Sequence, residues 1–250
     1  MNKYLKNLNR IEFVVTNACT GRCKHCSQGD HGPRAEHIDA DAAAQAVREI
    51  CAGYKIKSLM TFGGEPLLHP EVVCKIHKTA AELAIPQRDL ITNGFFTKDR
   101  GRIREVVEQL ADSGICKVLL SVDAFHQETI PLGPVKFFAG CAAGLGMSIA
   151  LSPAWLVREE DNNPYNIRTR EVLNEFSDFK IPVAPGNIIF PSGNAAKYLG
   201  EYFDKDTAVP NPYTQDPRDI RAISFSANGD VLKGNIYQSK ILDIINRYEP

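Results

Sequence analysis

With 250 residues, of which 44% are apolar and 24% charged, the chain is long enough for one large folded domain or an α/β barrel. Because 29 basic residues are balanced by 30 acidic ones, the sequence indicates neither a nucleic-acid partner nor a charged membrane surface. The first ten residues lack the apolar core of a signal peptide and no run is long enough to cross a membrane, so we expect a cytoplasmic protein with reduced thiols.

The predicted elements begin with a β-branched strand, Ile11–Thr16, which leads directly into a loop that contains Cys19, Cys23 and Cys26. After this loop, short strands alternate with helices. The later strands are expected at Ser58–Phe62, Asp89–Thr92, Lys117–Val122, Met147–Ser152 and Asn187–Phe190, and the helices at Ala40–Cys51, Glu71–Leu83, Asp99–Ser113, Val135–Leu145 and Tyr165–Phe179. Such alternation predicts parallel strands joined by right-handed crossovers.

Turn-forming residues recur along the chain at intervals of 30 positions, at Gly63, Asn93, Asp123 and Pro153. Each follows a predicted strand, so all four should lie at the C-terminal edge of the sheet. Six strand–helix units predict a partial, six-stranded (β/α)6 barrel, and in barrels this edge carries the active site. A doubly wound open sheet is the alternative, which the spacing alone does not exclude.

The last part of the chain has a different pattern. The Pro-rich stretch Val209–Pro217 indicates a linker, the following RAISFSANGDVLKGNI predicts a β-hairpin that turns at Ala227–Asp230, and Ser239–Tyr248 predicts a helix. We therefore expect a core of residues 1–204 and an extension of residues 205–250 that packs on it.

The three loop cysteines have CxxxCxxC spacing. Three thiolates are one short of a four-cysteine iron–sulfur site or of a four-ligand structural zinc, but they suit a [4Fe–4S] cluster with one open iron. Zinc is the alternative, with His25, His31 or a distant side chain as the fourth ligand. The remaining cysteines are isolated on predicted helices and strands and indicate small buried side chains: Cys51, Cys74, Cys116 and Cys141.

A second motif, Gly63-Gly64-Glu65-Pro66, follows the second predicted strand. Adjacent glycines let a ligand approach the backbone, and Glu65 offers a carboxylate to a cationic group. CxxxCxxC followed one helix later by GGEP resembles the signature of the radical S-adenosylmethionine (radical SAM) enzymes. The resemblance is specific from about Ile11 to Asp123 and suggestive to about Ile236.

This resemblance implies roles for residues on the predicted rim. Cys19, Cys23 and Cys26 would bind a [4Fe–4S] cluster, and Gly63, Gly64 and Glu65 would hold the methionyl end of S-adenosylmethionine (SAM). Further cofactor contacts would come from Asn93 in a Thr-Asn-Gly turn, from Ser121 and Asp123 near the ribose, from His25 near the adenine, from Ser152, and from the turn Pro191–Ala195. Outside this context, the residues that end the third, fourth and fifth strands would simply indicate turns.

The implied function is reductive cleavage of SAM to a 5′-deoxyadenosyl radical, which abstracts hydrogen from a small-molecule or peptide substrate. The electron would come from a donor such as flavodoxin or ferredoxin. The segment Ala124–Glu128, with Trp155 and Asn93 nearby, is the expected substrate surface. His126 and Glu128 are its candidate catalytic residues, because imidazole and carboxylate groups transfer protons, although a surface-loop histidine fits His126 equally well.

Two other functions stay open: an activase that installs a glycyl radical on a partner enzyme, and a non-enzymatic zinc-binding α/β protein. No cysteine occurs between Cys141 and residue 250, so this part of the chain cannot hold an auxiliary cluster through thiolates.

Overall fold

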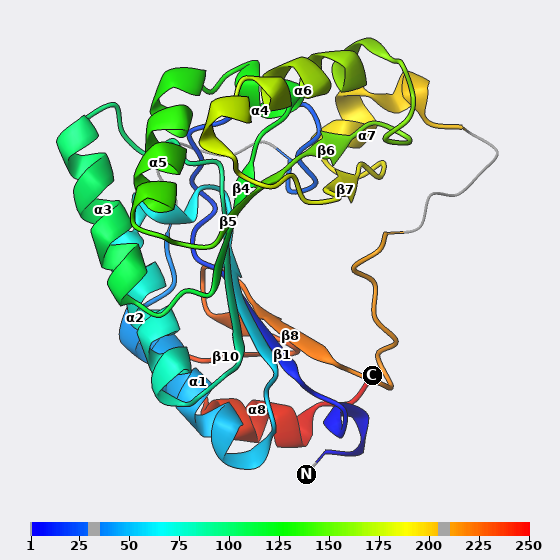
Figure 1. Cartoon of the computed structure of the whole chain (residues 1–250). Coiled ribbons are helices and arrows are strands. Elements are labelled where there is room, and N and C mark those ends of the chain that lie inside the picture. Colours follow the sequence, from blue (N-terminus) through cyan, green and yellow to red (C-terminus); the bar gives the residue numbers. More distant parts are fainter. Residues whose placement is uncertain (1, 30–35, 205–210) are drawn as a thin grey trace.

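In a computed structural model that describes residues 2–29, 36–204 and 211–250, the chain forms a six-stranded parallel sheet with helices along one face (Figure 1). The strand order is β5-β4-β3-β2-β1-β8. These strands are β1 (Arg10–Val14), β2 (Ser58–Phe62), β3 (Gln87–Thr92), β4 (Lys117–Ser121), β5 (Ile149–Ser152) and β8 (Ala222–Phe225). Strands β5 and β8 are the two edges of this sheet, and β5 has only an isolated parallel bridge between Leu151 and Val183 on its outer side. The predicted partial α/β barrel is thus confirmed, and it is not closed.

The helices between successive strands cover the outer face of this sheet (Figure 1). They are α1 (Ala40–Gly53), α2 (Pro70–Glu82), α3 (Arg100–Asp112) and α5 (Leu132–Gly144). Helices α4 (Ala124–Gln127), α6 (Pro164–Asn174) and α7 (Asn194–Tyr198) lie at the end of the molecule opposite both termini, whereas α8 (Ile241–Arg247) lies beside the termini (Figure 1). None of the helices in the described ranges is long and apolar enough to cross a membrane.

Alternation along β1 shows how the sheet divides its side chains between its two faces. Ile11 and Phe13 are fully buried, and Phe13 stacks on Phe225 of β8 with 4.6 Å between the ring centroids. Arg10 and Glu12 point to the other face, where Arg10 Nε lies 2.6 Å from Glu12 Oε1. One face of the sheet thus builds the core, and the other carries polar groups toward the interior of the partial barrel.

The sixth strand is β8, so the prediction that Asn187–Phe190 fills this position is wrong. Asn187–Ile188 forms β7, which pairs in parallel with β6 (Ala154–Trp155) as a separate two-stranded sheet. Burial explains the difference: both residues of β7 are exposed, whereas Ile223 and Phe225 of β8 are buried beside β1. The strand with the larger buried apolar surface completes the main sheet.

The predicted hairpin is also placed differently. Its first arm is β8 in the main sheet, and the antiparallel pair is formed farther along by β9 (Asp230–Val231) and β10 (Gly234–Asn235). The predicted turn does form, because Gly229 N donates a hydrogen bond to Ser226 O at 2.9 Å. The expected C-terminal helix is confirmed as α8. The division between a core of residues 1–204 and an extension of residues 205–250 stays a prediction, because β8 lies in the extension but joins the core sheet. His31 and the first residues of the expected linker lie outside the described residues.

Candidate functional site

The residues that recur at intervals of 30 lie together at one rim of the sheet. Gly63, Asn93 and Pro153 directly follow β2, β3 and β5, Asp123 follows β4 after one intervening residue, and these strands are parallel neighbours. The predicted rim is therefore confirmed as a single edge.

The GGEP turn lies against the segment that leads into the cysteine loop. Gly64 N donates to Thr16 O and Glu65 N donates to Ala18 O, both at 2.8 Å, immediately before Cys19. A Cβ on Gly64 would lie 2.1 Å from Ala18 O, and one on Gly63 would lie 2.5 Å from Thr16 O. Only glycines allow this approach, so the two motifs are held at the same end of the barrel.

The cysteine loop is partly shielded from solvent. Cys23 is 8% exposed, and Cys19 and Cys26 are half-buried. Burial is the main cause that raises the pKa of the Cys19 thiol to about 11, and burial also raises the pKa of Cys23. In the absence of a metal these thiols stay protonated, so metal binding at the loop must release protons.

A third segment holds the cysteine loop from the other side. Asn194 N donates to Cys26 O at 2.9 Å, and Asn194 Nδ2 donates to Cys23 O at 3.3 Å. Gly193 has φ of 53°, and a Cβ on it would lie 2.5 Å from Ser27 O. The predicted turn Pro191–Ala195 therefore contacts the loop backbone directly, although Asn194 itself was not singled out by the sequence.

Glu65 is fully buried, and its carboxylate binds groups of the protein itself. Oε1 accepts hydrogen bonds from Leu67 N and Thr92 Oγ1, and Oε2 accepts one from Asn93 N, at 2.9, 2.6 and 2.8 Å. Burial raises the pKa of Glu65 to about 7, although these hydrogen bonds act in the opposite direction. The side chain joins the ends of β2 and β3, and its expected contact with a cationic group stays a prediction.

Asn93 connects the next turn to the cysteine loop. Its Nδ2 donates to Thr20 Oγ1 at 3.2 Å and lies 3.7 Å from Cys19 Sγ, while its Oδ1 accepts from Phe95 N. The Thr-Asn-Gly turn thus positions the first cysteine. Thr20 has no signal of its own in the sequence beyond its place inside the motif.

Asp123 and His126 form a buried ion pair beside this loop. Asp123 is fully buried, its Oδ2 lies 2.8 Å from His126 Nδ1, and it also accepts hydrogen bonds from His126 N and Ala154 N. Burial opposes charge on both groups, but their mutual attraction is stronger in sum, so the pKa of Asp123 is lowered and that of His126 is raised. The ring of His25 lies 4.8 Å from the ring of His126, and burial lowers the pKa of His25 to about 4.

Glu128 also contacts the cysteine loop. Its Oε1 lies 3.0 Å from Nζ of Lys24, the residue between Cys23 and His25, and Nζ of Lys24 in turn donates to Tyr165 Oη at 3.4 Å. The two candidate catalytic residues are therefore both near the loop, and their roles stay predictions. The contact of Lys24 could not be read from sequence spacing, because it joins residues 104 positions apart.

Two serines and a tryptophan complete the predicted set. Ser121 and Ser152 are register partners at the ends of β4 and β5, as expected for neighbours on one rim. Trp155 is only 3% exposed, and its Nε1 donates to Pro185 O at 3.0 Å. Its indole is thus a buried structural group, and it does not form an exposed substrate surface.

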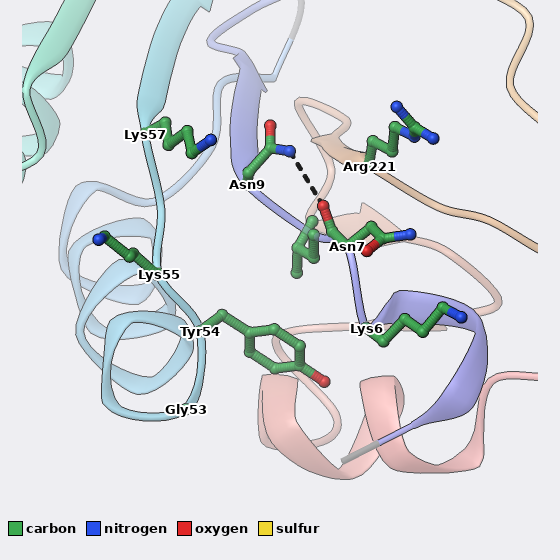
Figure 2. A pocket seen from close by; sticks show the side chains of 9 residues that line it. Lys6, Asn7, Asn9, Gly53, Tyr54, Lys55, Lys57 and Arg221 are labelled. Carbon is green, nitrogen blue, oxygen red and sulfur yellow. Dashed lines mark hydrogen bonds between the residues drawn. The ribbon is translucent and has the colours of Figure 1, made fainter.

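A cavity of about 480 Å³ lies at the opposite end of the barrel, where β1, β2 and β8 begin (Figure 2). Its charged lining residues are basic, namely Lys6, Lys55, Lys57 and Arg221. It contains no cysteine or histidine and is separated from the cysteine loop by the length of the sheet, so it is not part of this site.

Comparison with protein-family models shows to which family the chain with this rim belongs. The model of the Radical SAM superfamily matches residues 13–140, which include the cysteine loop, the GGEP turn and Asp123. The chain belongs to the radical SAM superfamily. Membership implies an enzyme that uses a [4Fe–4S] cluster together with SAM.

Known relatives resemble about half of the chain. A GTP 3′,8-cyclase of Clostridium perfringens is 27% identical over 130 residues, and one of Chlorobaculum tepidum is 24% identical over 127 residues; each match covers 51% of this chain. The matches cover only 38% and 36% of those two proteins.

Solved radical SAM structures share the fold over nearly the whole chain. Streptococcus suis SuiB bound to SAM matches with a TM-score of 0.62 at 14% identity, and the match covers 97% of this chain and 66% of the SuiB chain. The protein anSMEcpe, with bound SAM and the Cp18Cys peptide, has a TM-score of 0.59 at 13% identity and covers 96% of this chain and 81% of its own.

The rim fits the cofactors of the superfamily. Three thiols come from one loop, and the glycine contacts at Gly63, Gly64 and Gly193 leave no room for side chains between the neighbouring backbones. Thiolates are the ligands that iron–sulfur clusters require. The assignment of individual residues to the cluster and to SAM stays a prediction.

Proposed function

We propose that the chain cleaves SAM reductively and uses the radical to abstract hydrogen from a small-molecule or peptide substrate. The observation that supports this most strongly is the hydrogen-bonded contact of the Gly63–Glu65 turn with Thr16–Ala18, immediately before the cysteine loop. Bound at this rim, the cluster would supply one-electron chemistry for cleavage of a sulfonium carbon–sulfur bond of SAM, and SAM would supply the hydrogen-abstracting group.

The protein's own residues position the reactants. Cys19, Cys23 and Cys26 would hold the cluster, and the backbone of Gly63 and Gly64 would receive the methionyl end of SAM. Glu65 fixes the GGEP turn to β3 through its hydrogen bonds to Thr92 and Asn93, so its part is to hold the turn rigid.

The rim residues after β4 would complete the pocket. Ser121 and Ser152 present hydroxyls at adjacent strand ends, which suits the ribose, and Asp123 orients His126. His126 and Glu128 remain the candidates for proton transfer or substrate binding. A donor such as flavodoxin or ferredoxin and a cytoplasmic location are part of this proposal.

Neither relative fixes the substrate. The likeness to GTP 3′,8-cyclases covers about half of the chain, and SuiB and anSMEcpe share only its fold at 14% identity or less. The peptides bound in SuiB and anSMEcpe and the GTP named for the cyclases define the two substrate classes to screen first. Activation of a glycyl-radical enzyme is a narrower alternative within the same chemistry.

The test is anaerobic incubation of the reconstituted protein with SAM and dithionite, with 5′-deoxyadenosine measured by mass spectrometry. The wild type should carry about four irons per chain and release 5′-deoxyadenosine. Cys23→Ser should lose both, whereas the matched control Cys51→Ser on α1 should keep both. Release of 5′-deoxyadenosine by Cys23→Ser, or its absence from iron-loaded wild type, would contradict the proposal.

A further inference from the structure

Three metal-binding side chains at the rim lie close enough to share a single ion. The ligand atoms of Cys23, His25 and His126 all lie within 4.8 Å of one another. Within the described residues the three loop cysteines do not form such a group. The two arrangements suit different metals, because a [4Fe–4S] cluster binds each thiolate through a separate iron, whereas a single ion binds all its ligands at one point.

His25 contains a polar atom that the protein leaves without a partner. Its Nδ1 is buried and has no hydrogen-bond partner, while its ring packs against Phe125 and His126. An unsatisfied buried nitrogen destabilises the folded state, and a bound cation at this position would satisfy it. The ring is held in place by packing, so the nitrogen is presented toward its neighbours and not toward solvent.

His126 is oriented as metal-binding histidines commonly are. Its Nδ1 is engaged by Asp123 Oδ2 at 2.8 Å, which leaves Nε2 as the available ligand atom. Asp123 is fully buried and is itself fixed by the backbone N–H groups of His126 and Ala154. A carboxylate that fixes the ring from behind is the arrangement that raises the basicity of a ligating imidazole.

We propose that the iron-free protein binds one zinc ion through Cys23, His25 and His126, with Asp123 orienting His126. One thiolate and two neutral imidazoles are a ligand set that zinc accepts. When zinc binds, Cys23 and the Nε2 atom of the charged His126 each release a proton to solvent, while His126 Nδ1 keeps its hydrogen bond to Asp123. Tetrahedral zinc holds such ligand atoms about 3.5 Å apart, so the widest pair, which is separated by no more than 4.8 Å, must close by at most about 1.3 Å. The proposal rests on the proposed function in one respect, because Cys23 is a ligand of both the zinc ion and the expected cluster. The two metals cannot be bound at the same time, so zinc opposes cluster assembly.

The first experiment measures metal binding to the full-length chain after iron removal. Zinc titrated against a chromophoric chelator should bind at one ion per chain, and cobalt in its place should show charge transfer from a single thiolate. Pulsed EPR of the cobalt protein should show coupling to imidazole nitrogen. These wild-type measurements need no variant; if zinc does not bind, or if cobalt reports three thiolates, the proposal is overturned.

The second experiment compares matched variants whose folding is checked by circular dichroism. His25→Ala and His126→Ala should each weaken zinc binding at least tenfold, and Asp123→Asn, which removes the orienting group, by about tenfold or more. Cys26→Ser, a control from the same loop, should bind zinc within about twofold of wild type. An equal loss of affinity in Cys26→Ser would place the ion on the cysteine trio and overturn the proposal.

Cluster assembly separates this inference from the proposed function. Cys26→Ser should lose the cluster but keep zinc, whereas His25→Ala should lose zinc but still assemble an iron–sulfur cluster. One equivalent of zinc added before iron and sulfide should slow assembly in the wild type and not in His25→Ala. Wild type that takes up zinc but no cluster would contradict the proposed function alone; equal zinc inhibition of both proteins would contradict this inference alone.

Discussion

At the scale of single residues, Asp123 joins three groups at the rim. It receives hydrogen bonds from the backbone of His126 and Ala154 and pairs with the ring of His126, all from a fully buried position. Burial alone would lower the pKa of His126, but the nearby carboxylate raises it. The charge of Asp123 therefore determines on which side of its ordinary value the histidine titrates.

This dependence predicts the outcome of Asp123→Asn. Burial, the largest effect, is then opposed only by the smaller attraction of Glu65, so the pKa of His126 should fall from above to below its ordinary value of about 6.5, as an NMR titration of the imidazole protons would show. The free energy of unfolding should fall by about 3 kcal/mol, because a buried pair loses one partner. Glu128→Gln is the control, since its carboxylate pairs with Lys24 and should leave the pKa of His126 nearly unchanged.

At the scale of elements, the site depends on turns that pack backbone against backbone. The GGEP turn after β2 contacts the segment after β1, and the turn after β7 contacts the cysteine loop. Each contact passes through a glycine whose missing side chain is the space that the neighbouring backbone occupies. The strands provide the rim, and these turns fix the loop that should hold the cluster.

Gly64→Ala tests this dependence. Its Cβ would lie 2.1 Å from Ala18 O and 2.6 Å from Ala18 C, so the turn must move away from the cysteine loop. We expect the iron content after anaerobic reconstitution to fall several-fold. The matched control is Gly133→Ala in α5, where the added Cβ meets nothing within 4 Å. That variant should keep its iron and gain up to about 1 kcal/mol of stability, because alanine is the better helix former; equal iron in both variants would contradict the argument.

At the scale of the whole molecule, the sequence predicts β1 to β5 well, because each strand has its own apolar run. A turn residue at the rim also marks β2 to β5, and the cysteine loop marks the end of β1. It does not predict β8, whose partner β1 lies more than 200 residues earlier: Arg10 pairs with Ala222. Locally, Ala222–Phe225 and the following turn look like a hairpin, and the long-range burial of Ile223 and Phe225 beside β1, which includes the stacking of Phe13 on Phe225, places the segment in the main sheet instead.

The candidate site divides in the same way. The cysteines and the GGEP turn are predictable because their chemistry lies in short contiguous motifs. The pairing of Lys24 with Glu128 and the packing of His25 on His126 depend on how two distant segments meet, so no spacing in the sequence reveals them.

Two buried groups, Glu65 in the GGEP turn and His77 on α2, give the stability of the fold opposing responses to pH. Burial raises the pKa of Glu65 from 4.5 to about 7, so between these values the folded state binds more protons than the unfolded state and stability falls as pH rises. Burial, with a smaller contribution from Arg88, lowers the pKa of His77 from 6.5 to about 3. There the unfolded state binds more protons, and stability rises with pH. Between pH 4.5 and 6.5 the two effects oppose each other.

Substitution of either group should leave the pH dependence of stability that the other group causes. In urea denaturation at pH 4.5, 5.5 and 6.5, Glu65→Gln should add a rise in unfolding free energy with pH relative to wild type, and His77→Gln should add a fall. Each difference is bounded by about 1.4 kcal/mol per pH unit, the linkage of one proton. Both substitutions also change hydrogen bonds, because the new amide at position 65 faces Asn93 N and His77 pairs with Thr61 Oγ1 at 2.8 Å. The loss of these hydrogen bonds shifts the free energy of unfolding by an amount that does not depend on pH, so the test is the slope of the unfolding free energy against pH. If the slope of each variant equals that of the wild type, neither group titrates as its burial requires.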